Sequence, residues 1–426
     1  MLTFTWIFLV AVVLHFAIES WLEARHGNHV ASHRDAVPAR FADAVSLEAH
    51  QKAADYTLAK LNVSKWSELY GLALLLIWTL GGGLAWLDGV WSDMGWGSIW
   101  VGTAFLISFA LIGTLLDLPF SIYKTFVTEE KFGFNRMTAK LFVVDMIKGA
   151  LLMLLIGVPI VAVILWLMDS AGNLWWVWAW AFWTGFSLFM MWAYPTLIAP
   201  IFNKFEPMEE GETKSSIEAL LIRCGFESKG LFVMDGSKRS SHGNAYFTGF
   251  GKSKRIVFFD TLLKQLSMHE TEAVLAHELG HFKHGHIRKR MLIMFATSLA
   301  GFALLGWLSD QLWFYQALGV PQASNHALLI LFMLALPHFL FWMAPLSSWF
   351  SRKHEFEADA YAASHADAAD LITALVKMYE DNASTLTPDP LHSAWHDSHP
   401  PAPVRVAHLE SLMNRAAVNE EAVKAS

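Results

Sequence analysis

Cysteine and runs of basic residues are what this sequence lacks. Cys224 is the only cysteine among 426 residues, so the chain can form neither an internal disulfide nor a cysteine-ligated zinc site. The net charge is −7 and Lys and Arg form no run longer than three residues, which excludes the usual electrostatic footprint of a nucleic-acid-binding protein. Any metal ion must therefore be held by histidine and carboxylate side chains.

Apolar residues are abundant instead. They make up 54% of the chain, which also contains 20 Trp, and such a composition is typical of membrane proteins. Seven apolar stretches are long enough to cross a bilayer. They lie near 2–18, 66–87, 98–116, 149–168, 174–198, 291–308 and 327–346. The first stretch lacks a basic flank and a cleavage site, so we expect a retained span and not a signal peptide.

The loops between these stretches alternate in their content of Lys and Arg. The loops after the first, third, fifth and seventh stretches contain basic residues, whereas 88–97, 169–173 and 309–326 contain none. The positive-inside rule then places the N-terminus outside, and the long polar loop and the C-terminus in the cytoplasm. The sequence predicts a mainly α-helical, polytopic membrane protein with seven transmembrane helices.

The polar loop between the fifth and sixth stretches is about ninety residues long, far longer than a connector needs to be. We expect a folded catalytic insert with a helix over 212–225 and strands over 231–234, 245–250 and 255–260, the last two forming a hairpin around Gly251-Lys252-Ser253. The predicted division is 1–198 for spans one to five, 199–290 for the insert, 291–346 for spans six and seven, and 347–426 for a C-terminal catalytic segment.

A histidine pair with a glutamate beside it ends this insert, in His277-Glu278-Leu279-Gly280-His281. Two histidines four residues apart share one face of a helix and can reach a single Zn²⁺, and Glu278 can act as the base for a metal-bound water. Residues 270–276 are good helix formers without Gly or Pro. The alternative is two ordinary histidines, packed or solvated on a helix.

A catalytic zinc ion usually takes three protein ligands, so a third is needed. His284 and His286 are close in sequence, but three imidazoles on one short stretch of helix would surround an ion only with strain, and we interpret these two as a solvated cytosolic collar. We prefer Glu355, which follows the last span. Asp359, one turn further on, can accept a hydrogen bond from a ligating histidine. Glu357 points away from Glu355 around a helix and is ambiguous, with a surface charge as its simplest interpretation.

A Pro- and His-rich loop at 388–401, followed by Arg405, is a further candidate region. Peptide hydrolysis needs a donor that stabilises the oxyanion, and a His or Arg from this loop would serve. The residues alone favour a surface loop ordered by its prolines.

Taken together, these segments resemble the integral-membrane CAAX prenyl protease type 1 family, which are seven-span zinc metalloproteases with many bacterial relatives. The matching segments are 129–136, 198–205, 235–246, 256–262, the helix around the histidine pair, 355–359, and 398–401 with Arg405. They cover nearly the whole chain in the family's order. The resemblance implies seven helices around a water-filled chamber, a cytosolic zinc-protease cap with a small β-sheet and, as we expect, a bacterial source.

The resemblance also implies roles for the residues around the metal. His277, His281 and Glu355 match the family's ligands for one Zn²⁺ per chain. Glu278 matches its general base, and Asp359 matches the carboxylate that supports a ligating histidine.

Further roles implied by the resemblance concern the substrate. Asn244 and Ala245 lie on the edge strand that holds the substrate backbone, and His399 and Arg405 lie near the scissile carbonyl. Glu357 is a departure, because family members often carry Gln there, and it leaves an extra carboxylate near the site.

The function predicted from the sequence is zinc-dependent cleavage of prenylated CAAX-type or membrane-associated polypeptides. One alternative is a general protease that clears membrane proteins without a prenyl requirement. A membrane metal transporter would need ionisable residues within the spans, where we find almost none apart from His15 and His338. The expected partners are a peptide substrate and the lipid bilayer, in the inner membrane of a bacterium or the endoplasmic reticulum of a eukaryote.

Overall fold

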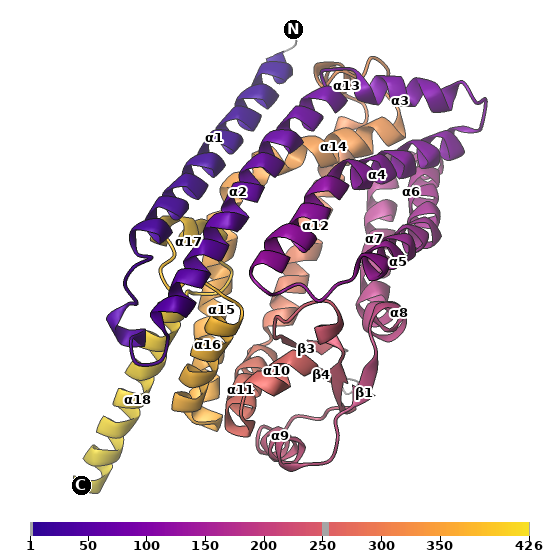
Figure 1. Ribbon diagram of the computed structural model, residues 1–426. Helices are drawn as coiled ribbons and strands as arrows, with labels where there is room; N and C mark the ends of the chain where they lie inside the picture. Colours follow the sequence, from indigo (N-terminus) through magenta and orange to yellow (C-terminus); the bar gives the residue numbers. More distant parts are fainter. Residues whose placement is uncertain (1–2, 249–254, 426) are drawn as a thin grey trace.

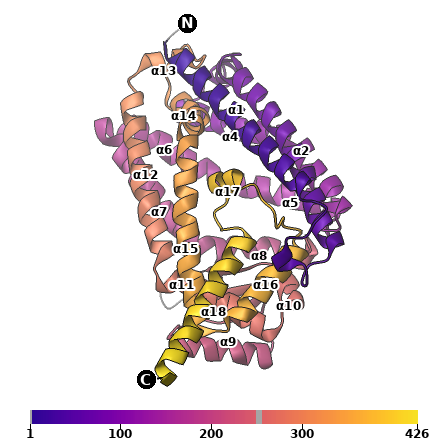
Figure 2. The same cartoon turned by 90° about the vertical axis from the view of Figure 1, so that its left-hand side faces the viewer.

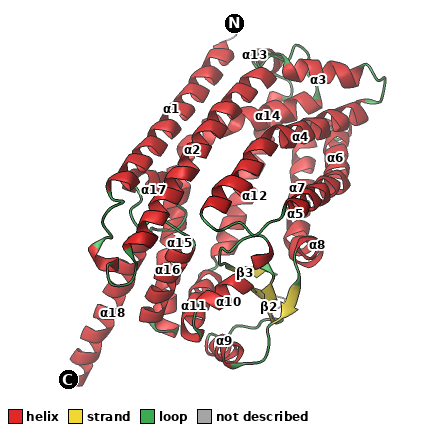
Figure 3. Cartoon of the chain, viewed as in Figure 1, coloured by secondary structure: helices red, strands yellow, loops and turns green. Residues whose placement is uncertain are grey.

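A computed structural model describes residues 3–248 and 255–425 of the chain. Long helices form one part of the molecule, and shorter helices with one small sheet form the other (Figures 1 and 3). The N-terminus lies at the end of the long helices, and the C-terminus lies at the opposite end, beside the short ones (Figures 1 and 2). The expected mainly α-helical architecture is confirmed.

Among the described residues, six helical segments are long and apolar enough to cross a membrane, and a bent pair makes up to seven. The segments are Thr3–Ser32, Ser98–Glu129, Ala139–Ser170, Gly172–Phe202, His286–Leu308 and Asn325–His365, with the pair Leu47–Trp78 and Gly83–Ser92. Their α-helices are α1 (Thr3–Ser32), α2 (Leu47–Trp78), α3 (Gly83–Ser92), α4 (Ser98–Tyr123), α5 (Ala139–Leu152), α6 (Val158–Ser170), α7 (Trp175–Ala193), α8 (Ala199–Phe202), α12 (His286–Leu308), α14 (Asn325–Leu340) and α15 (Ala344–His365), with α13 (Leu312–Ala317) as a connector. Several of these helices continue well beyond the apolar stretches. The continuation of α15 contains Glu355, the third candidate ligand, which therefore lies beyond the apolar stretch 327–346.

The bend between α2 and α3 follows from three consecutive glycines. The two helix axes differ by 53°. Gly82 has a φ of +81°, and a Cβ on Gly81 would lie 2.7 Å from the carbonyl oxygen of Ile77. Glycine is the residue that tolerates such backbone conformations and close approaches, so the interruption in the sequence becomes a break in the helix.

The sheet has four strands in the order β1-β2-β4-β3. The strands are β1 (Phe205–Pro207), β2 (Leu231–Met234), β3 (Ala245–Thr248) and β4 (Arg255–Phe259). β2 and β4 are parallel, and the two outer strands pair antiparallel to them. The three expected strands are present over 231–234, 245–248 and 255–259. Residues 249–250 of the second expected strand and the expected turn 251–253 lie outside the described residues. β1 was not anticipated, because three residues ending in proline carry no readable alternation.

Six further α-helices complete the described part of the chain. They are α9 (Glu212–Arg223), α10 (Asp260–Gln265), α11 (Met268–Lys283), α16 (Ala368–Asp381), α17 (Pro390–His396) and α18 (Ala402–Ala425). A core of buried apolar side chains joins α9, α11, α16 and the sheet: Ile217, Leu220, Leu231, Ile256, Phe258, Leu262, Leu275, Leu279, Leu371 and Leu375. This core fixes α11, the helix with the histidine pair.

The position of α11 is set at its start and at its middle. Its first turn has a capping box, in which the Ser267 hydroxyl accepts from the Glu270 amide and the Glu270 carboxylate accepts from the Ser267 amide. In the middle, a Cβ on Gly280 would lie 2.8 Å from the Cα of Ala358, so α11 and α15 touch backbone to backbone. This close approach brings the histidine pair opposite Glu355.

Candidate active site

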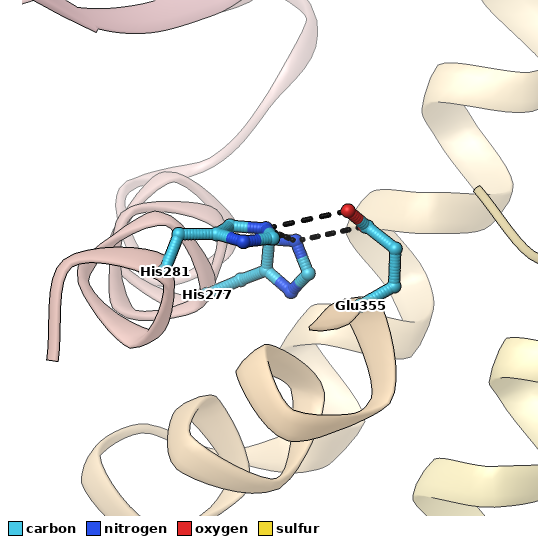
Figure 4. A group of neighbouring side chains, drawn as sticks. All are labelled: His277, His281 and Glu355. Atoms are coloured by element: carbon cyan, nitrogen blue, oxygen red, sulfur yellow. Dashed lines mark hydrogen bonds and ion pairs between the residues drawn. The ribbon is translucent and has the colours of Figure 1, made fainter. Parts of the chain in front are cut away.

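Two histidines and one glutamate meet between α11 and α15. Figure 4 shows the imidazoles of His277 and His281 and the carboxylate of Glu355 pointing toward one another. The two Nε2 atoms are 3.3 Å apart, and each lies 3.4 Å from an oxygen of Glu355. Zinc–nitrogen and zinc–oxygen bonds are about 2.0–2.2 Å long, so these separations suit three donors around one ion.

One oxygen of Glu355 provides a test of this fit. The side chain is 1% exposed, and Oε2 is buried without a hydrogen-bond partner among the described residues. Burying an unpaired carboxylate oxygen is costly, because it loses its interaction with water and gains nothing in return. A cation bound by all three side chains would satisfy it, so the donor set fits a metal ion.

His277 is oriented by a buried ion pair. Its Nδ1 lies 2.8 Å from Oδ1 of Asp359, whose side chain is 0% exposed. The guanidinium of Arg405 binds both oxygens of Asp359, and its Nη2 lies 3.2 Å from His277 Nδ1. A proton on Nδ1 donated to Asp359 leaves the lone pair of Nε2 facing His281 and Glu355.

Burial gives the ionisable groups of α11 different proton affinities. Burial and the charge of Arg405 lower the pKa of His277, but Asp359 and Glu355 outweigh them and leave it raised. Burial and the neighbouring His277 lower the pKa of His281 to about 3, so this imidazole is neutral at neutral pH and free to bind a metal ion. Burial raises the pKa of Glu278, which suits a side chain that takes up a proton during a reaction.

The structure separates the two residues expected near the scissile bond. His399 Nε2 lies 3.5 Å from Oε1 of Glu355, and its side chain is 64% exposed. A cavity of about 370 Å³ is lined in part by His399, Tyr379 and His392. Arg405, in contrast, is buried and contacts Asp359 and His277. His399 therefore faces the open side of the cluster, and Arg405 lies behind His277.

The expected substrate strand lies at the edge of the sheet. β3 is the last strand in the order, so among the described residues one of its edges has no strand partner. Asn244, just before it, is exposed, and its backbone carbonyl accepts a hydrogen bond of 2.9 Å from the Phe259 amide. A free strand edge can bind an extended peptide through main-chain hydrogen bonds.

Two family models together match most of the chain. Residues 26–204 match the model of the "CAAX prenyl protease N-terminal, five membrane helices" family, and residues 207–413 match that of "Peptidase family M48". The CAAX prenyl protease 1 homolog of Oryza sativa subsp. japonica is 38% identical over 94% of this chain and 96% of its own length. The chain belongs to the CAAX prenyl protease 1 family. It is an integral membrane metallopeptidase.

Other relatives agree. CAAX prenyl protease 1 of Saccharomyces cerevisiae is 35% identical and covers 95% of this chain and 94% of its own length. The human homolog is 33% identical, with 88% and 89% covered. The crystal structure of S. mikatae Ste24p has a TM-score of 0.89 at 33% identity, with 96% of this chain and 99% of that chain covered. The predicted family and fold are confirmed; these relatives are eukaryotic, and the bacterial source stays a prediction.

Sequence reasoning missed two contacts near the site. His286, interpreted as part of a solvated collar, is 1% exposed and lies against His281, so that interpretation was wrong. Glu357, interpreted as a surface charge, is hydrogen-bonded to His286. The sequence feature that could have indicated these contacts is Gly285, which follows one helix and turns the chain before the next.

Further missed contacts tie the segment before β3 to the helices. His242 Nε2 lies 3.3 Å from Oε2 of Glu129, and its Nδ1 lies 3.0 Å from Oδ1 of Asn382. Tyr56 on α2 donates to the other oxygen of Glu129. The resemblance marked 129–136 and 235–246 separately, but only the fold shows that they meet.

Proposed function

We propose that this chain is a zinc endopeptidase that cleaves CAAX-type prenylated or membrane-associated polypeptides. The observation that carries the chemistry is the buried carboxylate of Glu355. Its Oε2, which has no hydrogen-bond partner among the described residues, lies 3.4 Å from Nε2 of His277, and its Oε1 lies 3.4 Å from Nε2 of His281. Two imidazoles and one carboxylate form a donor set used by catalytic zinc. The substrate class is supported by the relatives named CAAX prenyl protease 1.

The side chains around the ligands have separate roles in this proposal. A bound zinc ion would supply Lewis-acid chemistry at the scissile carbonyl. Glu278 takes a proton from the attacking water and passes it to the leaving amine. His399, on the open side, donates a hydrogen bond to the developing oxyanion, and Arg405 holds Asp359 in place behind His277. Asp359 holds His277 in its ligating orientation.

Substrate binding and membrane orientation complete the proposal. Asn244 and Ala245 bind the substrate main chain at the free edge of β3. The helices enclose a water-filled chamber beneath the zinc site. The N-terminus lies outside and the site faces the cytoplasm, because the loops on that side hold the Lys and Arg residues. The functional units are 1–198, 199–290, 291–346 and 347–426. The protein resides in the inner membrane if its source is a bacterium, or in the endoplasmic reticulum if its source is a eukaryote.

The test is cleavage of a farnesylated CAAX peptide and of its unprenylated twin by the purified full-length protein, with zinc content measured in the same samples. Wild type is compared with Glu278→Gln and with Glu218→Gln, which makes the same chemical change at an exposed position of α9. We expect cleavage of the farnesylated peptide by wild type and Glu218→Gln only, with zinc in all three proteins.

Other outcomes separate the alternatives. Equal cleavage of both peptides would indicate a general membrane-protein protease with no prenyl requirement. Full activity of zinc-loaded Glu278→Gln would contradict the assigned base, and a wild type that binds no zinc would contradict the metal site.

A further inference from the structure

A line of hydrogen bonds runs from the second histidine ligand to a carboxylate outside the ligand cluster. His281 Nδ1 lies 3.0 Å from His286 Nδ1, and His286 Nε2 lies 2.9 Å from Oε2 of Glu357. The other nitrogen of His281, Nε2, faces His277 and Glu355. We propose that His286 and Glu357 form a relay that orients His281 for metal binding and increases its basicity, a proposal that rests on the proposed zinc site.

The roles of all four ring nitrogens follow from one constraint. A nitrogen that binds a metal ion carries no proton, so neutral His281 must carry its proton on Nδ1. That N–H donates to Nδ1 of His286, which must then be unprotonated. His286 therefore carries its proton on Nε2 and donates it to Glu357. The negative charge of Glu357 polarises both hydrogen bonds of this chain, which increases the basicity of His281 at Nε2.

The fold builds this contact through a turn between two helices. His281 and His286 are five residues apart, and on one continuous helix they would point about 140° away from each other. Gly285 has a φ of +66° and separates α11 from α12, which folds His286 back onto His281. The ring of His286 is 1% exposed and stacks on His354 with centroids 4.0 Å apart. Water has little access to replace either hydrogen bond.

The position of Glu357 on α15 also fits the relay. Glu355 points into the ligand cluster, and Glu357, two residues later, points away from it and reaches His286 at the flank. The same helix thus supplies a ligand, Glu355, and two supporting carboxylates, Asp359 for His277 and Glu357 for His281.

A competing interpretation uses the same residues differently. Donor atoms of His286, His354 and Glu357 lie within 4.8 Å of one another, as three metal ligands would. However, both ring nitrogens of His286 already have partners, and the positive charges of Lys289 and Arg290 act on this group. These observations favour the relay over a second metal site.

The test measures zinc affinity of the purified full-length protein by competition with a chelator, together with zinc per chain and peptide cleavage. His286→Phe keeps the stacking ring and removes both nitrogens, and Glu357→Gln removes the charge. We expect about 10- to 100-fold weaker zinc binding for His286→Phe and about tenfold for Glu357→Gln. The double variant binds zinc no more weakly than His286→Phe alone, because the charge of Glu357 acts on His281 only through the hydrogen bonds of His286.

Two controls accompany these variants. Glu218→Gln repeats the amide substitution at an exposed site, and His284→Gln changes a histidine two residues from His286 that, in the part of the chain the structure describes, has no hydrogen bond to His281 or Glu357. Both retain wild-type zinc affinity. If His286→Phe fails to fold, Glu357→Gln decides alone, since its side chain is 33% exposed and tolerates substitution.

The results that overturn the relay are distinct from those that overturn the proposed function. Wild-type zinc affinity in both His286→Phe and Glu357→Gln, with cleavage intact, would reject the relay and leave the peptidase standing. Additive losses in the double variant would show two independent roles and also reject it. Two zinc ions per wild-type chain, with one lost in Glu357→Gln, would replace the relay with a second metal site. A wild type without zinc would reject the proposed function itself.

Discussion

The two histidines of the proposed zinc site are held in contrasting ways. His277 donates directly to Asp359, a fully buried carboxylate that Arg405 neutralises. His281 reaches its carboxylate through another imidazole, and that carboxylate, Glu357, is 33% exposed. A buried charge is costly without an opposite charge, whereas an exposed one is hydrated. We therefore expect the buried side of the site to contribute to both metal binding and folding stability, and the open side to contribute to metal binding alone.

The largest effect on activity is expected from a substitution that changes neither the contacts of His277 nor those of His281. Glu278→Gln removes the general base and should lower kcat by about 100- to 10,000-fold, while zinc affinity stays that of wild type. Steady-state cleavage and metal analysis on the same preparation check this. A parallel loss of zinc would mean that Glu278 supports the ligands and is not the base.

Glu355→Gln affects both sides at once, because Glu355 faces both histidines. Loss of the carboxylate should leave well under one zinc per chain after dialysis, with activity falling in proportion. Added zinc should restore part of the activity. Full occupancy with wild-type activity would show that another residue is the third ligand.

Arg405→Leu disrupts only the buried side of the site, where Asp359 contacts His277. It leaves the carboxylate of Asp359 buried without its cation, which should cost about 3–5 kcal/mol of stability, the usual effect of removing one partner of a buried pair. Denaturation of the metal-free protein measures this loss. Glu357→Gln should be nearly neutral in the same assay, and equal destabilisation of the two variants would contradict the contrast between the two sides.

The smallest expected effect is the release of protons when zinc binds. The raised pKa of His277 means that it holds a proton to higher pH than His281, whose pKa is about 3. Zinc must displace that proton, so zinc affinity should fall as the pH falls through the pKa of His277. Calorimetry near pH 6 in buffers of different ionisation enthalpy should show release of about one proton per zinc, and release of two would mean that both histidines are protonated alike.

The sequence indicated His277, His281 and Glu355 from local patterns, and their role as zinc ligands stays a prediction. Four-residue spacing on a helix places His277 beside His281, and the same spacing relates Glu355 to Asp359. The apolar stretches were equally readable, because a bilayer imposes a minimum length. These patterns require no knowledge of tertiary contacts.

What escaped prediction depends on how separate elements meet. His286 contacts His281 only because Gly285 turns the chain, and Glu357 finds His286 only because α11 and α15 touch at Gly280. Arg405 is adjacent to Asp359 through the packing of α18 against α15. Spacing along one helix cannot show any of these contacts, since each joins residues on different elements.

Anomalous scattering at the zinc edge from crystals of the purified wild-type protein tests the central claim most directly. The account predicts one zinc peak, about 2.0–2.2 Å from Nε2 of His277, Nε2 of His281 and an oxygen of Glu355. A peak held by His286, His354 and Glu357, or no peak at the first position in zinc-loaded active protein, would contradict it.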